Sequence, residues 1–307
     1  MQSFFVDAGG PVFVADYGGS GPVIVLLHGL GGSHLNWMSV APGLARNHRV
    51  LAPDLPGFGR TPSEDRGASV AANVRLLERV IRQVSDDRVV LVGNSMGGMI
   101  SLGLAARSPQ LLSGLVLVDP ALPAARGERI RLDPVALRFM AAYALPRFGE
   151  YLFSATAKRL GADVLVKSTL ELCTVHMQRI DGALVDAMVA LERERMEQPR
   201  WHRAVVHGSR SIVKLLLSRA RIEGWIRQIT VPMLLIHGVQ DEVVKVRAAR
   251  AAADLRPDWE YVEFESCGHV PMMEHPQRFL AVLTDWLRRT APSELSGTAV
   301  VEETLSA

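Results

Sequence analysis

Cysteine is scarce in this chain of 307 residues, which contains only Cys173 and Cys267. One widely separated pair gives neither a disulfide framework nor a CxxC metal pair. No apolar run approaches the ~20 residues that a membrane-spanning helix needs. The first residues, MQSFFVDAGGPVFV, lack the basic segment and the long apolar stretch of a secretory signal peptide. These absences predict a cytoplasmic protein in a reducing environment, with no membrane span and no metal site.

A strong excess of one charge is also missing, because 34 Lys and Arg residues face 32 Asp and Glu residues, for a net charge of +2. The basic residues are scattered, so the sequence does not predict a nucleic-acid partner. Hydrophobic residues make up 48% of the chain and charged residues 21%, as in proteins with a sizeable core. The length allows one large domain with an insertion, or two domains.

Strand and helix patterns alternate along the first 120 residues and again near the end of the chain. Continuous apolar runs that end in glycine, such as PVIVLLHG and VVLVG, are typical of parallel strands buried on both faces. Between them, residues 69–84 repeat apolar side chains at helical intervals. This order predicts an α/β fold with a parallel sheet and helices on both faces. The expected strands lie within residues 11–18, 22–29, 49–59, 89–93, 114–120, 229–238 and 260–264.

The alternation stops after residue 120, and residues 121–227 show helical patterns without a clear strand. We therefore predict a core made of residues 1–120 and 228–290, interrupted by a helical insertion. The last residues, 291–307, are small and polar, which predicts a disordered tail.

The segment GNSMGG places Ser95 between a buried strand and a helix. The pattern Gly-x-Ser-x-Gly in this context is the nucleophile elbow, a tight turn that requires small neighbours, here Gly93, Gly97 and Gly98. The turn presents the serine hydroxyl at the carboxyl edge of the sheet, where the helix amino terminus offers N–H donors. The alternative is a glycine-rich turn in which Ser95 only caps the helix.

A nucleophilic serine needs a base and an acid that orients the base. After a nucleophile elbow these follow in the order acid and then histidine. In HGVQDEVV, Asp241 comes just after an apolar strand, and in SCGHVPMMEHP, His269 follows the last strand. We predict Ser95, Asp241 and His269 as a catalytic triad.

Other residues compete for these roles. Asp119 also ends a strand and is a second candidate for the acid, although Pro120 beside it favours a turn residue. His275 is a second candidate for the base, but it stands where the last helix begins. The three histidines of the insertion lack metal-ligand spacing and are expected to be structural. They are His176, His202 and His207.

The motif LLHGLGG leaves a strand at the same predicted edge. The backbone N–H groups of Leu30 and of Met96, the residue after the serine, form the expected oxyanion hole. His28 is expected to support this loop rather than to take part in chemistry. The alternative is that the glycines here only form a tight turn.

Five motifs in order, HGLGG, DLPGFGRT, GNSMGG, HGVQDEVV and GHVPMMEHP, resemble the α/β-hydrolase superfamily over nearly the whole chain. The resemblance implies an eight-stranded, mostly parallel sheet, with residues 121–227 as a helical cap over the active site. Superfamily members that use an aspartate nucleophile are disfavoured by Ser95. GNSMGG is similar to the meta-cleavage-product hydrolases, which cleave a carbon–carbon bond, but these typically carry a tryptophan where this chain has Val270.

We therefore predict a serine hydrolase that cleaves an ester or thioester of a small to medium apolar acyl compound, with no cofactor. The first alternative is a carbon–carbon hydrolase of ring-fission dienones, and the second is a ligand receptor built on a hydrolase fold. The oligomeric state has no signal in the sequence. Apolar residues of the insertion are candidates for the acyl pocket: Leu137, Met140, Leu145, Phe148 and Met177, with Leu152, Phe153 and Met188 as further candidates.

Overall fold

A computed structural model of the chain describes residues 1–63, 66–125, 127 and 148–290. These residues form an eight-stranded sheet in the order β1-β2-β4-β3-β5-β6-β7-β8. Strand β2 pairs antiparallel with β1 and β4, and the other neighbours are parallel. The predicted α/β class with a mostly parallel sheet is confirmed. The strands are β1 (Gln2–Asp7), β2 (Pro11–Asp16), β3 (Val23–Leu27), β4 (Arg49–Pro53), β5 (Val89–Asn94), β6 (Leu112–Val118), β7 (Met233–Gly238) and β8 (Glu260–Phe264).

Two helices begin close to the residues where the sequence predicts them to start. Ser69 caps α2 by accepting the Ala72 N–H, and the last helix begins at Pro276. The helices of the described residues are α1 (Ala41–Leu44), α2 (Val70–Val84), α3 (Met96–Arg107), α5 (Phe148–Cys173), α6 (Gly182–Glu197), α7 (His202–Leu216), α8 (Arg219–Gln228), α9 (Val246–Leu255), α10 (Pro271–Glu274) and α11 (Pro276–Thr290).

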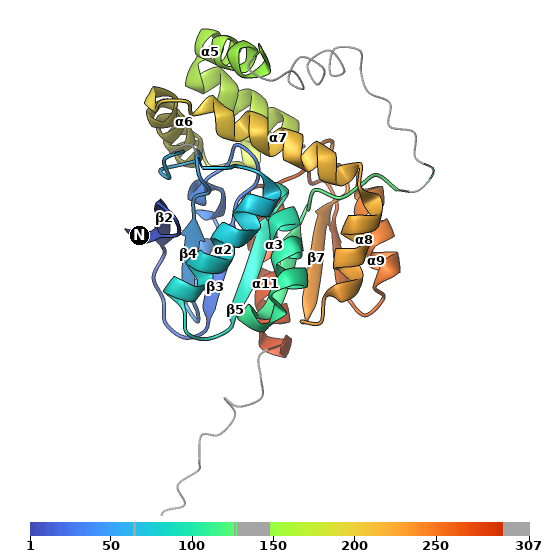
Figure 1. Cartoon of the computed structure of the whole chain (residues 1–307). Coiled ribbons are helices and arrows are strands. Elements are labelled where there is room, and N and C mark those ends of the chain that lie inside the picture. Colours follow the sequence, from blue (N-terminus) through green and yellow to red (C-terminus); the bar gives the residue numbers. More distant parts are fainter. Residues whose placement is uncertain (64–65, 126, 128–147, 291–307) are drawn as a thin grey trace, which may run out of the picture.

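The sheet is covered on both faces. Apolar side chains of α2, α3, α8 and α9 form one core cluster with the strands, and those of α1, α10 and α11 form a second. Figure 1 shows α2, α3 and α8 in front of the sheet and α11 behind it. Strands β5 and β7 are buried along their whole length, as expected for strands between two helical layers.

The predicted helical insertion follows β6, and α5, α6 and α7 lie together beyond one end of the strands (Figure 1). Helix α5 is kinked at Gly161, where φ is 78°. Helix α8 comes last in the inserted segment and packs into the core through Ile222 and Ile226. The predicted tail, 291–307, lies outside the described residues.

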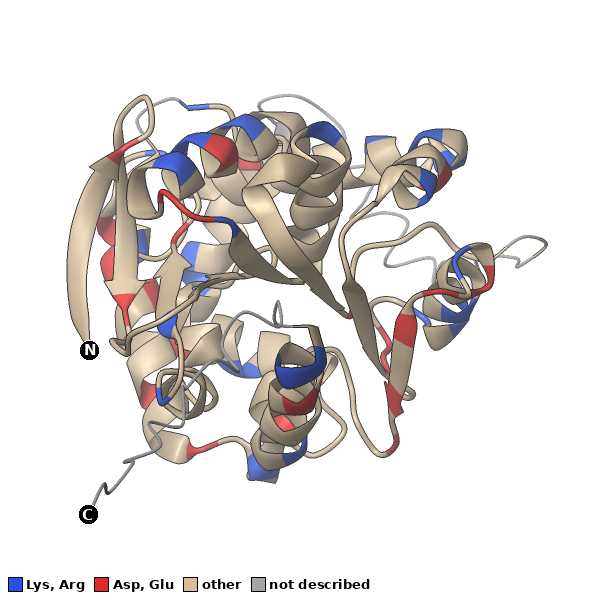
Figure 2. Cartoon of the chain, turned by 90° about the horizontal axis from the view of Figure 1, so that it is seen from below, with Lys and Arg blue, Asp and Glu red and all other residues tan. Residues whose placement is uncertain are grey.

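Basic and acidic residues are interspersed along the helices (Figure 2), in keeping with the net charge of +2. Within the described ranges, none of the helices has the length and apolar character required to cross a membrane.

Candidate active site

Ser95 lies at the turn between β5 and α3, with φ 55° and ψ −114°. A positive φ in a residue other than glycine costs about 1–3 kcal/mol and persists only where the surroundings hold it. Here the Ser95 N–H donates to the Val118 carbonyl at 3.0 Å, and the Ser95 carbonyl accepts from the Ala121 N–H at 3.0 Å. Both bonds go to the segment that leaves β6, so the fold holds the turn in its strained conformation.

The glycines around Ser95 are needed for close approach. A Cβ atom on Gly93 would lie 2.5 Å from the Gly97 carbonyl oxygen, and one on Gly97 would lie 2.4 Å from the Leu27 carbonyl oxygen. Both distances are too short for any side chain. A Cβ on Gly98 would be 2.8 Å from that of Pro120. The strand and the helix can therefore meet at Ser95 only if these positions carry no side chain.

Asp241 and His269 come from the loops after β7 and β8, and they meet in the fold. His269 Nδ1 lies 2.6 Å from Asp241 Oδ2. The other carboxylate oxygen, Oδ1, accepts the N–H groups of Val243 at 2.7 Å and Val244 at 3.0 Å. With both Asp241 oxygens engaged, the imidazole is held in one orientation, with Nδ1 toward the acid.

Burial by itself would raise the pKa of Asp241. The hydrogen bond and the charge of His269, together with the Val244 N–H, outweigh this effect and hold that pKa below the ordinary value of 3.8. The carboxylate is therefore ionised at neutral pH, and the Asp241–His269 bond is charge-assisted. This state lets Asp241 stabilise an imidazolium at His269.

Asp119, the rival acid, does not bond to His269. Its Oδ1 accepts the Gly238 N–H at 2.8 Å and lies 3.6 Å from His237 Nε2. Burial raises the pKa of Asp119 well above 3.8, and the charge of the nearby Asp241 raises it further. Asp119 therefore tends to keep its proton, which makes it a poor partner for an imidazolium.

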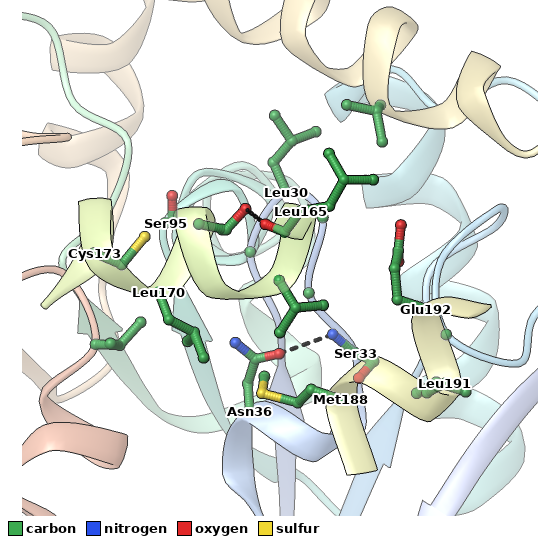
Figure 3. A pocket seen from close by; sticks show the side chains of 18 of the residues that line it. Leu30, Ser33, Asn36, Ser95, Leu165, Leu170, Cys173, Met188, Leu191 and Glu192 are labelled. Carbon is green, nitrogen blue, oxygen red and sulfur yellow. Dashed lines mark hydrogen bonds between the residues drawn. The ribbon is translucent and has the colours of Figure 1, made fainter. Parts of the chain in front are cut away.

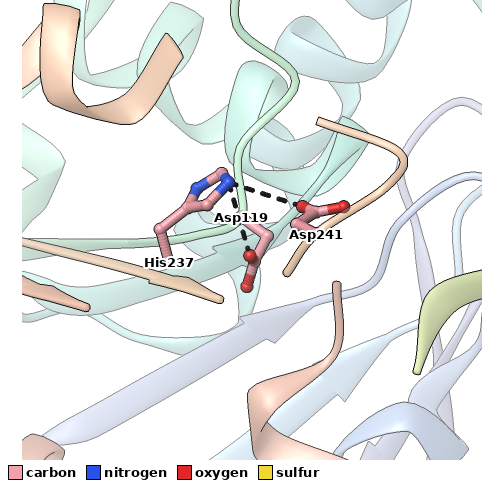
Figure 4. A group of neighbouring side chains, drawn as sticks. All are labelled: Asp119, His237 and Asp241. Carbon is pink, nitrogen blue, oxygen red and sulfur yellow. Dashed lines mark ion pairs between the residues drawn. The ribbon is translucent and has the colours of Figure 1, made fainter. Parts of the chain in front are cut away.

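Asp119, His237 and Asp241 form a buried cluster, with one ligand atom of each within 4.8 Å of the others (Figure 4). Such a group could hold a cation, but Asp119 Oδ1, His237 Nε2 and both Asp241 oxygens already have hydrogen-bond partners. Asp119 Oδ2 and His237 Nδ1 are buried without one among the described residues. His237 Nε2 lies 2.8 Å from the Val244 carbonyl oxygen, so its N–H donates there. Burial also lowers the pKa of His237, which favours the neutral ring. We interpret the cluster as a hydrogen-bond network that supports the loop of Asp241.

The raised pKa of Asp119 predicts that Asp119→Asn will stabilise the protein at neutral pH. The unfolded chain loses the Asp119 proton near 3.8, whereas the folded protein keeps it to a higher pH. Wild-type stability therefore falls as the pH rises from 3.8 through the folded-state pKa. Asparagine does not titrate, and its Oδ1 can still accept the Gly238 N–H.

Urea unfolding of both proteins at several pH values measures this effect. The gain in free energy of unfolding should grow with pH, from near zero at the lowest pH where both proteins fold to a plateau above the folded-state pKa. A loss of stability at neutral pH, or a gain that does not depend on pH, would contradict the assignment of the proton to Asp119.

His28 supports the loop expected to form the oxyanion hole. Its Nδ1 lies 2.7 Å from the Gly29 carbonyl oxygen, and its Nε2 lies 3.0 Å from the Leu55 amide. Because the Leu55 N–H donates to Nε2, the Nδ1–H must donate to Gly29. Burial lowers the pKa of His28, in agreement with this neutral form. The ring thus joins the loops after β3 and β4.

Leu30 and Ser95 line one cavity of about 330 Å³ beneath the insertion (Figure 3). Met96 is the first residue of α3, so its N–H has no acceptor within the helix. His269 lines the same cavity. The structure therefore brings together the predicted nucleophile, base and acid, with the Leu30 loop beside them.

The insertion supplies much of the cavity wall. Helix α5 contributes most, and α6 and α7 add to it. Of the pocket candidates, Phe153 and Met188 line the cavity, whereas Met177 does not and packs against the second core cluster instead. Leu137, Met140 and Leu145, and the side chain of Phe148, lie outside the described residues. The lining residues of the insertion are Phe153, Leu165, Val166, Thr169, Leu170, Cys173, Met188, Leu191, Glu192, Arg195 and Val205.

Charged groups in the cavity wall were not predicted. Arg195 is buried and forms a paired contact with Glu192, at 2.7 Å for Nε and 2.5 Å for the second nitrogen. Its guanidinium also stacks 4.7 Å from the centre of the Trp201 ring. Cys173 lies in the same wall, but burial raises the pKa of its thiol to about 12, so it is not a rival nucleophile.

Two other histidines considered in the sequence analysis, His275 and His207, contact groups other than Asp241. His275 contacts Arg179 and Ser266, and His207 contacts Glu150. These contacts are separate from Asp241.

Asn94, the residue before Ser95, is a site residue that the sequence analysis missed. Its Nδ2 donates to the carbonyl groups of Val118 and His269, both at 3.1 Å. The side chain therefore joins the end of β6 to the backbone of the predicted base. Only its place in the Gly-Asn-Ser motif could have drawn attention to it.

Comparison with known proteins agrees with this architecture. Residues 22–276 match the family model described as alpha/beta hydrolase fold. The chain is 32% identical over 300 residues to 2-hydroxy-6-oxo-6-(2'-aminophenyl)hexa-2,4-dienoic acid hydrolase of Metapseudomonas resinovorans, covering 94% of this chain and 91% of that protein. It is 29% identical over 269 residues to pimeloyl-[acyl-carrier protein] methyl ester esterase of Aromatoleum aromaticum, covering 87% and 98%.

Among solved structures, a serine hydrolase involved in carbazole degradation superposes with a TM-score of 0.68 at 27% identity. The match covers 94% of this chain and 99% of that one. Both curated relatives named above are hydrolases, and the family match spans most of the sequence. The chain belongs to the α/β-hydrolase family.

Proposed function

We propose that this hydrolase cleaves an ester or thioester of a small to medium apolar acyl compound through a covalent acyl-enzyme. Ser95 is the nucleophile, His269 the general base and Asp241 the acid that orients it. The observation that carries the proposal is the 2.6 Å contact between His269 and Asp241, at a cavity that also contains Ser95 in its strained turn.

In the first half of the reaction, the Ser95 hydroxyl attacks the substrate carbonyl and its proton passes to His269 Nε2. The carbonyl oxygen becomes an oxyanion, which accepts hydrogen bonds from the N–H groups of Leu30 and Met96. One such donor contributes about 3–4 kcal/mol to transition-state stabilisation. The tetrahedral intermediate then collapses, and the leaving alcohol or thiol takes the proton from His269.

In the second half, water replaces the leaving group. His269 takes a proton from the water while the water oxygen attacks the acyl carbon. His269 then returns a proton to Ser95 Oγ as the acid product leaves. Asp241 stays ionised throughout and stabilises the imidazolium in both halves. Every step uses groups of this chain and water.

The cavity supports an apolar acyl group. Phe153, Leu165, Leu170 and Met188 are among the side chains that line it. Arg195 is the one arginine or lysine among the described residues that line the cavity, and it is already paired with Glu192. A neutral substrate therefore fits the described wall better than an anionic one.

We also propose that residues 121–227 act as a cap on a core of residues 1–120 and 228–290. The position of α5, α6 and α7 over the cavity supports this division. A cytoplasmic location is part of the same proposal and is supported by the two free cysteines, Cys173 and Cys267.

A carbon–carbon hydrolase of ring-fission dienones is the second candidate. It is favoured by the dienoic acid hydrolase relative, at 32% identity, and it would use the same three residues. A ligand receptor without catalysis is the third candidate, because fold and site residues do not fix activity.

A substrate panel separates these candidates. We expect hydrolysis of p-nitrophenyl esters of increasing acyl length, with an optimum at short to medium chains, and much slower cleavage of a ring-fission dienone. Faster cleavage of the dienone would favour the carbon–carbon hydrolase. Folded wild type that cleaves neither, and that does not react with a fluorophosphonate, would favour the receptor.

Leu165→Ala tests whether α5 contacts the acyl chain. Removing this leucine enlarges the cavity, so the ratio of kcat/KM for long over short esters should rise about 10-fold. Leu172→Ala is the matched control, because Leu172 is on the same helix but is 59% exposed. An unchanged chain-length profile in folded Leu165→Ala would place acyl selection in the core loops instead.

A further inference from the structure

The proposed base, His269, has a carboxylate behind its loop that the mechanism above does not use. We propose that Glu274 is a positioning residue: it joins the His269 loop to the end of α5, so that the insertion helps to place the base. This inference rests on the proposed role of His269.

Glu274 ends the short helix α10 and is 2% exposed. Its Oε2 accepts the Gly268 N–H at 2.8 Å. Its Oε1 accepts the N–H groups of Val175 at 3.1 Å and His176 at 2.8 Å. One carboxylate therefore holds backbone groups of two segments that are far apart in the sequence.

The same two segments also touch directly. The His269 N–H donates to the Cys173 carbonyl oxygen at 2.7 Å. A Cβ on Gly268 would lie 2.4 Å from that oxygen, so only glycine allows this approach. On the opposite side, the His269 carbonyl accepts from Asn94 Nδ2 at 3.1 Å. The base is thus fixed between the nucleophile turn and the end of α5.

These contacts connect substrate binding to the base. Helix α5 lines the cavity with Leu165, Leu170 and Cys173, and it ends at the residue that accepts the His269 N–H. Glu274 holds the next turn of chain, at Val175 and His176, against Gly268. A shift of α5 would therefore move His269 relative to Ser95, unless the Glu274 contacts were released.

Glu274→Gln tests the proposal. The side-chain oxygen of glutamine can accept hydrogen bonds from one of the two segments. The NH2 group of glutamine then faces a backbone N–H of the other segment, so the hydrogen bond to that segment is lost. We expect the rate of Ser95 acylation by a fluorophosphonate, and kcat for a p-nitrophenyl ester, to fall about 10- to 100-fold, since a displacement near 1 Å has such an effect. KM should change less than about twofold, because the cavity lining is retained.

Glu223→Gln is the matched control. Glu223 is another buried glutamate, 8% exposed, and it pairs with Arg219 and Arg227 on α8. Glu223→Gln should leave the rate of Ser95 acylation unchanged. The low-field proton resonance of His269 Nδ1 should shift or broaden in Glu274→Gln and stay in place in Glu223→Gln. A merely structural glutamate would lower thermal stability without changing this resonance.

Amide hydrogen exchange in the wild type covers the case in which Glu274→Gln does not fold. If one carboxylate holds both segments, the amides of Gly268, Val175 and His176 should exchange at similar, slow rates. Exchange of Val175 and His176 at the rate of exposed amides would overturn the proposal. So would a folded Glu274→Gln with wild-type acylation and an unshifted resonance. Failure of the wild type to acylate at Ser95 would instead overturn the proposed function.

Discussion

Replacing Ser95 with alanine is expected to lower kcat for a p-nitrophenyl ester on the order of 10⁶-fold, by analogy with serine proteases that lose their nucleophile. The variant keeps the cavity and the oxyanion donors but has no group that can form the acyl-enzyme. Its fold should be retained, since Ser95 holds its position through backbone hydrogen bonds to Val118 and Ala121. Steady-state kinetics, with circular dichroism to verify folding, measure the effect.

Ser108→Ala is the control for Ser95→Ala. Ser108 is buried, 3% exposed, at the opposite end of α3, where its backbone N–H caps the helix. Its substitution should leave kcat within about twofold. Retention of a tenth or more of wild-type activity by folded Ser95→Ala would mean that another group performs the attack.

Asp241→Asn is expected to lower kcat about 10⁴-fold, as in serine proteases with the equivalent substitution. The reason lies in the two backbone N–H groups of Val243 and Val244, which donate to one oxygen of the side chain. Asparagine would keep its oxygen there and turn its NH2 group toward His269 Nδ1. The imidazole would then carry its proton on Nε2 and could not accept the proton of Ser95.

Asp119→Asn is the matched control for Asp241→Asn, because both change a buried carboxyl group in the same cluster. It should lower kcat less than about tenfold, since Asp119 bonds to Gly238 and not to His269. Both variants need a measured unfolding curve, so that loss of activity is not loss of fold. If the two effects were reversed, Asp119 would be the orienting acid.

The elbow could be predicted because its requirements are local in sequence. A strand, a serine between glycines and a helix follow one another within 19 residues, from Val89 to Arg107. Asp241 and His269 could be predicted because each follows its own strand of a parallel sheet, so the topology alone brings them to one edge. The structure adds the hydrogen bond that distinguishes Asp241 from Asp119, which also ends a strand.

Strand β1 was not predicted, and its pattern explains why. In Gln2–Asp7 only Val6 is buried, so the segment lacks the apolar run of a strand covered on both faces. It pairs antiparallel with β2 at the edge of the sheet, so it has one neighbouring strand instead of two. Such a strand depends on its partner rather than on its own composition.

The lining of the cavity and the support of the base depend on contacts between distant segments. Met177 and Met188 are both methionines of the insertion, yet only Met188, on α6, lines the cavity. Met177 lies in a turn before α6 and packs against the second core cluster. Asn94 and Glu274 bind backbone groups, which have no signature in the sequence of the partner. Composition and periodicity could not have identified either residue.

The most direct test of the central claim is the identity of the residue that a fluorophosphonate modifies. Wild-type protein is labelled, digested and mapped by mass spectrometry, with Ser95→Ala treated in parallel. The account predicts one adduct per chain, on the peptide that contains Ser95, and none in the variant. An adduct on any other residue, or no adduct on folded wild type, would contradict it.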